Sequence, residues 1–208
     1  MKDNILDGVR EYYSQKIISH GTTSQGVDWN SKESQYLRFR QLCKVIDKQQ
    51  DYSILDYGCG YGELINFLTE EANTFTRYIG FDISDEMVAK AEGLFGKTNR
   101  NISFTNALSD DVHDYVVASG IFNVKLNLAD GSDWLEYILQ TLKTINQRTS
   151  KGFAFNALTK YSDKEYMKDY LYYADPLELF DFCKREFSRN VALLHDYDLY
   201  EFTIIVRK

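Results

Sequence analysis

The feature that most constrains this fold is a glycine-rich turn between two apolar segments. The stretch SILDYGCGYGELI, residues 53–65, places Gly58, Gly60 and Gly62 at alternate positions. Glycine loses more backbone entropy on folding than any other residue, so a turn this rich in glycine needs a reason. A strand that enters such a turn and leaves it as a helix brings its backbone close to a ligand, with helix N–H groups facing that ligand. The stretch therefore predicts a ligand-binding turn at the carboxyl end of a strand.

The rest of the chain continues this alternation of strand and helix. Seven β-rich runs are expected, at residues 53–58, 77–83, 102–107, 115–122, 152–158, 191–195 and 201–207. Strands separated by helices form a parallel sheet with helices on both faces. The last two runs are joined by too few residues for a parallel crossover, so one of them must run antiparallel. We predict an α/β three-layer sandwich whose seven-stranded sheet is mostly parallel, with one antiparallel strand near the C-terminus.

Two stretches of helical spacing, 3–19 and 31–48, precede the first strand. The chain of 208 residues contains a single proline and no evident linker, so we expect one domain. Within it, residues 1–50 are expected to form an N-terminal helical cap and residues 51–208 the ligand-binding core. The core carries an insert at residues 159–175 that is unusually rich in tyrosine.

Composition disfavours several classes of partner. The formal net charge is −7 and no cluster of lysine and arginine stands out, which disfavours nucleic acid and anionic membranes. No run approaches membrane-spanning length, and the N-terminus lacks the apolar core of a signal peptide. Cys43, Cys59 and Cys183 show no metal-ligand spacing, so we expect reduced thiols, a cytoplasmic location and no metal ion.

Three acidic residues around the turn narrow the ligand. Glu63 stands where a dinucleotide fingerprint carries its third glycine, and an acid there would repel a pyrophosphate, which disfavours NAD and FAD. Asp56, near the end of the first strand, can meet a cationic group. Asp82 ends the next strand, where a carboxylate can accept both hydroxyl groups of a ribose. S-adenosylmethionine fits this set, because it has a ribose, two positive groups and no phosphate.

Three motifs resemble those of a known family. ILDYGCGYGE (54–63) is similar to the first motif of class I methyltransferases, and YIGFDIS (78–84) is similar to their second. DYVVASGIF (114–122) resembles the strand and loop that pass under the methionine moiety in that family. The resemblance implies a Rossmann-like fold, S-adenosylmethionine as cofactor and S-adenosylhomocysteine as product.

The same resemblance implies a set of cofactor contacts. Asp56 would lie near the methionine amino group, Asp82 would bind the ribose and Ile83 would pack on the adenine. Asn106 is the best match for the group that meets the adenine amino group, with Asp110 or Asp111 as alternatives. The whole expected cofactor-binding set is Arg38, Asp56, Gly58, Cys59, Gly60, Asp82, Ile83, Asn106 and Ser119.

The sequence offers two candidates for the residue that removes a proton from the acceptor. Small members of the family often carry a histidine in the loop after the fourth strand, where this chain has Asn123. His20, in the loop expected over the ligand, and His195, at the end of a strand, are the catalytic candidates, each weighed against a structural hydrogen bond. His113 falls in a polar segment and is expected to be solvated.

The acceptor is expected to be a small polar molecule. Tyrosines such as Tyr161 in the insert, together with Trp29 and Asn123, are its expected contacts, since aromatic faces suit a sugar or base. Packing of these rings on the core is the alternative interpretation.

Segments outside the core motifs, HGTTSQGVDWNSKESQYLRFRQL, GFAFNALTKYSD and LLHDYDLYEFTIIVRK, resemble small bacterial methyltransferases of surface-polysaccharide (capsule or lipopolysaccharide) assembly. That resemblance implies O- or N-methylation of a nucleotide-linked sugar or a sugar phosphate. A non-catalytic S-adenosylmethionine-binding sensor or subunit, and a methyltransferase for protein or RNA, are the alternatives. The sequence does not reveal the oligomeric state.

Overall fold

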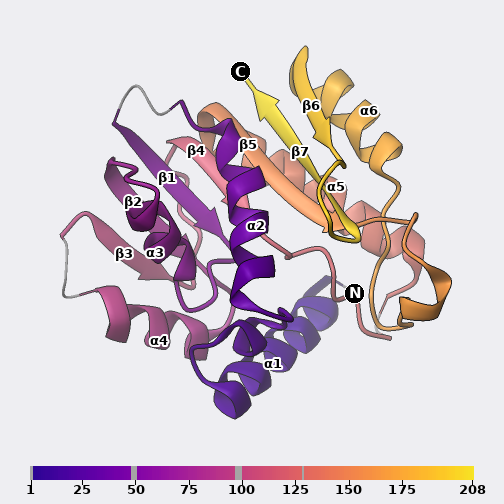
Figure 1. The fold of residues 1–208 in the computed structure, drawn as a ribbon, viewed down its shortest axis with the longest axis horizontal. Coiled ribbons are helices and arrows are strands. Elements are labelled where there is room, and N and C mark those ends of the chain that lie inside the picture. The colour runs from indigo at the N-terminus through magenta and orange to yellow at the C-terminus, as the bar shows by residue number, and fades with distance from the viewer. Residues whose placement is uncertain (1, 48–50, 97–99, 128) are drawn as a thin grey trace.

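The computed structural model describes residues 2–47, 51–96, 100–127 and 129–208. A seven-stranded sheet forms its centre, in the order β3-β2-β1-β4-β5-β7-β6 (Figure 1). The strands are β1 (Tyr52–Tyr57), β2 (Phe75–Phe81), β3 (Ile102–Thr105), β4 (His113–Ala118), β5 (Thr149–Leu158), β6 (Asn190–Leu194) and β7 (Glu201–Arg207).

The strand directions confirm the fold predicted from sequence. Strands β1 to β5 pair in parallel, and β7 runs antiparallel to β5, with Phe155 opposite Ile204. Because β6 is antiparallel to β7, it runs in the same direction as the first five strands. One reversed strand therefore lies next to the sheet edge, in a Rossmann-like arrangement.

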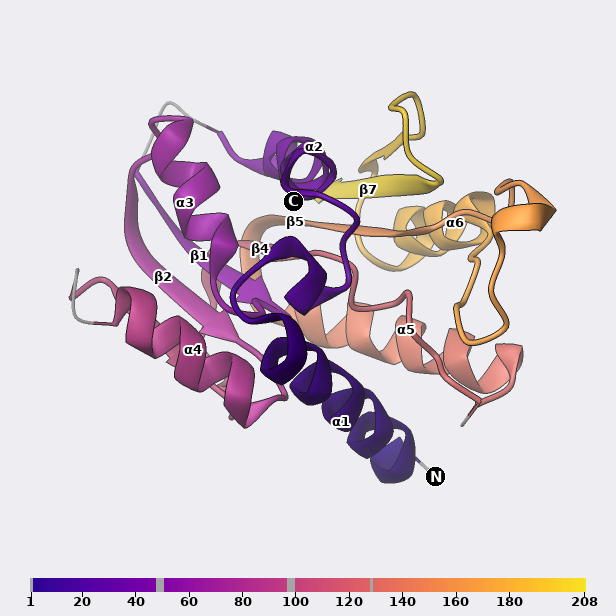
Figure 2. The same ribbon diagram turned by 60° about the horizontal axis from the view of Figure 1, so that its bottom comes forward.

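Helices cover both faces of the sheet (Figures 1 and 2). The α-helices are α1 (Lys2–His20), α2 (Lys32–Leu42), α3 (Glu63–Glu70), α4 (Asp85–Phe95), α5 (Gly131–Gln147) and α6 (Pro176–Glu186). The described residues also form short 3-10 helices, which are η1 (Ser24–Val27), η2 (Cys43–Val45) and η3 (Lys164–Tyr166). The stretch 31–48, predicted as one helix, becomes α-helix only as far as Leu42 and continues as η2.

Alternating side chains along the strands divide the core into two layers. Ile54 and Val117 pack with α2 and α3 on one face, whereas Leu55 and Val116 pack with α5 and α6 on the other. This period of two is what a sheet buried on both faces requires.

Local signals in the sequence set where helices begin. The Ser84 side chain accepts a hydrogen bond from the Met87 backbone and caps α4, and Asp175 with Pro176 opens α6 in the same way. α1 lies beside α4, at the carboxyl ends of the parallel strands (Figure 2). In the described ranges, no helix has the length and hydropathy needed to cross a bilayer.

Candidate functional site

A first cavity lies where the strands β1, β2 and β4 end. Its walls are residues 56–60 of the glycine turn, 81–83 after β2 and 119–121 after β4. Val9 and Tyr13 of α1 also line this cavity. Ligands of open parallel sheets bind at the carboxyl ends of the strands. The glycine turn lies at such an end, directly after β1, in agreement with its predicted position.

The turn needs glycine for a steric reason. Gly58 has φ +82°, and a Cβ atom there would lie 2.2 Å from Cγ2 of Ile121. The backbone N–H groups of Gly58 and Cys59 donate to the carbonyl of Phe81, at 2.7 and 3.0 Å. The turn is therefore fixed to the end of β2 and leaves its other side open to the cavity.

Asp82 joins the turn to the second strand. Its Oδ2 accepts a hydrogen bond from the Gly60 backbone at 2.9 Å, and its Oδ1 accepts one from the Ser84 backbone at 2.9 Å. Burial raises the pKa of Asp82 to about 6, although both backbone hydrogen bonds oppose the rise. Each carboxylate oxygen keeps a second acceptor site, so the group can still bind a pair of hydroxyls.

Asp56 places a second carboxyl group in the same cavity wall. It is 3% exposed and accepts a hydrogen bond from the Tyr78 hydroxyl at 2.6 Å. Burial raises the pKa of Asp56 to about 7; the bond from Tyr78 lowers it, and nearby Asp82 raises it further. Two buried carboxyl groups in one cavity favour a cationic ligand, because a cation stabilises their charged forms.

Two residues that line this cavity each carry a buried polar atom with no hydrogen bond to another described residue. Oγ of Ser119 and Oε1 of Gln35 are buried and find no hydrogen bond within the described part of the chain. Such atoms are costly unless a ligand or water satisfies them, so both are ligand-contact candidates. Sequence reasoning missed Gln35; its only signal is a polar residue four positions before Phe39, on the buried side of α2.

Other predicted cofactor residues are divided between cavity and surface. Cys59, Gly60 and Ile83 line the first cavity. Asn106 does not line it: the residue is exposed and its Nδ2 donates to Asp85 at 2.5 Å. The two alternatives, Asp110 and Asp111, likewise do not line the cavity; they pair at 3.0 Å with Arg148 and Arg77 respectively.

A second, larger cavity adjoins the first. Its volume is about 420 Å³, against about 100 Å³ for the first. Tyrosines of the insert, Asn123, Arg38 and Glu201 line it, and Tyr13, Val27 and Trp29 line both cavities. The insert is largely irregular, with only the short η3, so its tyrosines reach the cavity from a loop.

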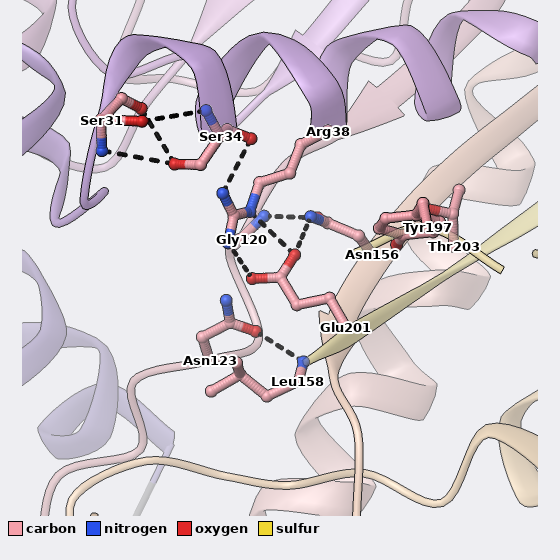
Figure 3. A network of polar contacts seen from close by, with 10 residues as sticks. All are labelled: Ser31, Ser34, Arg38, Gly120, Asn123, Asn156, Leu158, Tyr197, Glu201 and Thr203. Atoms are coloured by element: carbon pink, nitrogen blue, oxygen red, sulfur yellow. Dashed lines mark hydrogen bonds and ion pairs between the residues drawn. The ribbon is translucent and has the colours of Figure 1, made fainter. Parts of the chain in front are cut away.

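Figure 3 shows a buried polar network. Of its members, Arg38 and Glu201 line the second cavity and Gly120 lines the first. Arg38 donates from Nε and Nη2 to the two carboxylate oxygens of Glu201, at 2.9 and 2.7 Å. Asn156 donates to Glu201 at 2.7 Å and accepts from the Gly120 backbone at 2.7 Å. This chain of bonds connects α2 and β7 to the loop that follows β4.

Trp29 links the two ends of this network, because it contacts both Arg38 and Gly120. The Arg38 guanidinium lies 4.0 Å from the centroid of the Trp29 ring. The far edge of the indole packs on Gly120, which has φ +73° and where a Cβ atom would lie 2.4 Å from the ring. Trp29 is therefore held between the Arg38 guanidinium and the backbone of Gly120, and it lines both cavities.

The predicted acceptor contacts have different positions. Asn123 is buried beside the second cavity, and its Oδ1 accepts from the Leu158 backbone at 3.1 Å. Arg38, predicted as a cofactor contact, lines the second cavity and not the first. Tyr161 is 57% exposed, lies outside both linings and faces His195, with ring centroids 6.0 Å apart.

The structure brings neither candidate base to a cavity. His20 ends α1 and His195 follows β6; both are exposed and neither lines either cavity. The expectation that His113 is solvated is wrong, since it is 3% exposed at the start of β4. Burial, with Arg77 nearby, lowers the pKa of His113. The described residues include no group of three or more histidine, cysteine or acidic side chains that could hold a metal ion.

The chain is similar to known proteins in sequence. Residues 54–145 match the family model described as "Methyltransferase domain". A protein of Mycobacterium tuberculosis (strain ATCC 25618 / H37Rv), described as "Putative methyltransferase Rv1506c", is 50% identical over 167 residues, which cover 79% of this chain and 98% of that protein.

Similarity also extends to solved structures. Magnesium protoporphyrin IX methyltransferase from Synechocystis PCC 6803 with bound S-adenosylmethionine superimposes with a TM-score of 0.56 at 13% identity, over 85% of this chain and 77% of that one. The same enzyme with bound S-adenosylhomocysteine gives a TM-score of 0.59 at 13% identity, over 85% and 81%. These likenesses concern the fold.

The residues of the first cavity fit the cofactor that this fold carries. The carboxyl groups of Asp56 and Asp82 suit an ammonium group and a ribose. The buried Ser119 and Gln35 oxygens, which bond to no described residue, can bind a polar group, and Gly58 leaves room for the approach of a ligand. The chain belongs to the class I, Rossmann-like methyltransferases, and it is an enzyme that uses S-adenosylmethionine.

Proposed function

We propose that this enzyme methylates an oxygen or nitrogen atom of a small polar acceptor that combines a sugar ring with phosphate, such as a nucleotide-linked sugar or a sugar phosphate. The observation that carries the proposal is the second cavity, which shares a wall with the first and mixes tyrosine rings with buried polar groups. Aromatic faces with a few convergent polar atoms suit a sugar.

The shared wall supports direct transfer. Bound in the first cavity, S-adenosylmethionine supplies a methyl group on a positively charged sulfur, and its transfer to an acceptor O–H or N–H leaves S-adenosylhomocysteine and releases a proton. Most of the rate enhancement of such an in-line displacement comes from positioning. Trp29, fixed by Arg38 and Gly120, is a rigid surface against which an acceptor in the second cavity can be positioned.

Two tyrosines at the second cavity offer a site for a flat ring. Tyr166 and Tyr200 are 61% and 43% exposed, and their rings lie 5.9 Å apart with a 34° tilt. Large exposed aromatic side chains on a cavity wall favour a ligand that stacks on them. A nucleobase or a sugar ring meets this requirement.

Lys168 supplies positive charge beside these rings. Its ammonium group lies 3.4 Å from the Tyr170 hydroxyl, and no acidic side chain in the described ranges pairs with it. The other lining cation, Arg38, is already neutralised by Glu201. Lys168 is therefore the group we assign to an acceptor phosphate.

Sequence resemblance in the flanking segments supports a place for this reaction in bacterial surface-polysaccharide assembly. The three cysteines are buried and form no disulfide bond, which suits the cytoplasm. An RNA acceptor is less suited, because the chain carries a net charge of −7. A protein acceptor is less suited because the second cavity, of about 420 Å³, is of the size that holds a small molecule.

The test is methyl transfer from S-adenosylmethionine labelled in its methyl group. We expect product with some members of a panel of nucleotide-linked sugars and sugar phosphates, and less or none with the same sugars lacking phosphate. Lys168→Met should raise KM for phosphate-bearing acceptors by about tenfold or more, because a charge-assisted contact is lost. Lys164→Met is the matched control, since exposed Lys164 lies outside the cavity lining.

Two results would contradict the proposal. Label incorporated into protein or RNA, but into no member of the panel, would move the enzyme to a macromolecular acceptor. Equal effects of the Lys168 and Lys164 substitutions would remove the assigned phosphate contact while leaving a neutral sugar as acceptor.

A further inference from the structure

Asn156 is a buried polar residue that lines neither cavity but bonds to a residue of each. It lies on β5, is 0% exposed, and is the only polar residue in the run GFAFNAL (152–158). Its Nδ2 donates to Oε2 of Glu201 at 2.7 Å, and its Oδ1 accepts from the Gly120 backbone N–H at 2.7 Å (Figure 3). Glu201 lines the second cavity and Gly120 lines the first.

These two bonds require an amide side chain. The residue must present a donor to a carboxylate and an acceptor to an N–H group, and an amide has one of each. Turning the amide over would bring two acceptors together at Glu201 and two donors together at Gly120. The carboxylate is itself fixed by Arg38, which donates to both of its oxygens. The ion pair therefore determines which side of Asn156 faces Gly120.

Asn156 holds the peptide bond between Ser119 and Gly120, two residues that line the first cavity. Gly120 has φ +73°, and glycine adopts positive and negative φ with similar ease, so this peptide can turn over at little cost. In the structure its N–H is directed toward Asn156. A trans peptide directs its C=O opposite to its N–H, so the Ser119 carbonyl points away from Asn156.

The strand order shows which part of the cofactor meets this peptide. β2, β1 and β4 are neighbours in that order. Asp82 follows β2, residues 119–121 follow β4, and Asp56 of β1 pairs in register with Val117 of β4. A cofactor whose ribose binds Asp82, as predicted from the sequence, extends across the end of β1. Its amino-acid end then lies at residues 119–121.

We propose that Asn156 is a positioning residue for the amino-acid end of the cofactor. It holds the Ser119–Gly120 peptide with the carbonyl toward the first cavity, where a carbonyl oxygen accepts a hydrogen bond from an ammonium group. Asn156 itself touches no cofactor atom. Without it the buried Gly120 N–H loses its acceptor, and the peptide turns until that N–H finds another. The ammonium group then loses its carbonyl partner.

The test compares two ligands that differ at the amino-acid end. S-adenosylhomocysteine carries that end, and methylthioadenosine carries a methyl group in its place. Asn156→Leu is similar in volume and removes both side-chain bonds. We expect its Kd for S-adenosylhomocysteine to rise by about tenfold and its Kd for methylthioadenosine to change by less than about twofold. Calorimetry measures both constants, by competition for the weaker ligand.

Thr203→Val is the matched control. Thr203 lies opposite Asn156 on β7, is 0% exposed and shares a hydrogen bond of 2.8 Å with the Tyr197 hydroxyl. Its substitution removes a buried hydrogen bond without touching residues 119–121, and should leave the ratio of the two constants unchanged. Equal weakening of both ligands in Asn156→Leu, or weakening of neither, would overturn the proposal and leave Asn156 as a structural residue of the sheet.

A second measurement uses the wild-type protein, so it does not depend on how well a variant folds. In ¹⁵N NMR spectra, S-adenosylhomocysteine should shift the Gly120 amide signal and slow its exchange with solvent, because the bound ligand fixes the peptide. Methylthioadenosine should leave both unchanged. Equal responses to the two ligands, or no response to either, would place the amino-acid end elsewhere and overturn the proposal.

Discussion

Arg38 and Glu201 form a two-point ion pair although 163 positions separate them. Nε of Arg38 lies 2.9 Å from Oε2 of Glu201, and Nη2 lies 2.7 Å from Oε1. Their side chains are 8% and 1% exposed, so the pair is shielded from water. The pair connects the helix that precedes the glycine turn to the reversed strand at the end of the chain. Both residues line the second cavity, so a substitution of either one changes that cavity as well as the fold.

Glu201→Gln should destabilise the protein strongly. The substitution leaves the Arg38 guanidinium buried without a counter-charge, and breaking a buried pair from one side costs about 3–5 kcal/mol. Urea unfolding followed by circular dichroism measures the loss. Replacing both partners, as in Arg38→Met with Glu201→Leu, should cost less than Glu201→Gln alone.

Glu136→Gln is the control for that measurement. Glu136 is exposed on α5, and its substitution should change the free energy of unfolding by less than about 0.5 kcal/mol. A loss below about 1 kcal/mol for Glu201→Gln would show that the pair is not desolvated as the structure has it.

Gly120→Ala should damage the cofactor site while leaving the sheet intact. The residue has φ +73°, and its Cβ would lie 2.4 Å from the Trp29 ring, so either the loop or the indole must move. We expect Kd for S-adenosylmethionine to rise by about tenfold or more, from backbone strain of about 1–2 kcal/mol and the displaced ring.

Gly93→Ala is the matched control, since it lies in α4 with nothing within 4 Å of a Cβ. It should stabilise the protein by about 0.5–1 kcal/mol and leave binding unchanged. Unchanged affinity in Gly120→Ala would show that Trp29 is not held against this loop.

Local chemistry explains why the first cavity was predictable. The turn around Gly58 needs positive φ, and the acid at Asp82 follows a strand, so residue type alone marks both positions. The seven strands were found because each face of the sheet is buried, which produces short apolar runs. The reversed strand followed from the short connection before Glu201, which excludes a crossover.

The second cavity could not be derived in this way. Its walls come from α1, the loop around Trp29, the insert and the start of β7, and no periodicity relates these segments. Asn106 was predicted to contact the cofactor but does not line the first cavity. A loop side chain can turn toward any neighbour, and this one donates to Asp85. Gln35 and Tyr13 gain their positions only from tertiary packing.

Asp82→Ala should weaken binding of S-adenosylmethionine. It removes the acceptor for the ribose hydroxyls and also the acceptor for the Gly60 and Ser84 backbones. The loss should be about 2–3 kcal/mol, or roughly 30- to 150-fold in Kd, measured by calorimetry. Asp85→Ala, three residues away and outside the cavity, should change Kd by less than about twofold. Equal effects of the two substitutions would contradict the ribose assignment.

The two exposed histidines give a test of where the acceptor loses its proton. His20 and His195 line neither cavity, so His20→Asn and His195→Asn should each change kcat by less than about twofold. A fall of about 10²-fold in either would assign general-base catalysis to that histidine and would require α1 or the loop after β6 to move over the acceptor. His113→Asn, which changes a buried residue, should alter stability and not turnover.

The raised pKa values of two buried carboxyl groups predict that the free energy of unfolding falls as pH rises. The pKa of Asp56 is about 7 in the folded protein against 3.8 ordinarily, and that of Asp82 is about 6. The folded protein therefore binds more protons than the unfolded chain between about pH 4 and pH 7. Without ligand, the free energy of unfolding contributed by these groups should decline across that window and level off above it.

Binding of the cofactor should show the opposite pH dependence through Asp56. The positive groups of S-adenosylmethionine favour the ionised carboxylate, so at pH 5.5 binding must release a proton that at pH 7.5 has already left. Kd should therefore fall by about tenfold or more between these pH values, with proton release at the lower one, measured by calorimetry in buffers of different ionisation enthalpy. Asp56→Asn, whose amide oxygen can still accept the Tyr78 hydroxyl, should bind more weakly at pH 7.5 and show a flatter profile. A wild-type Kd that does not change with pH would mean that Asp56 is ionised before the ligand arrives, or that no cationic group of the ligand lies near it.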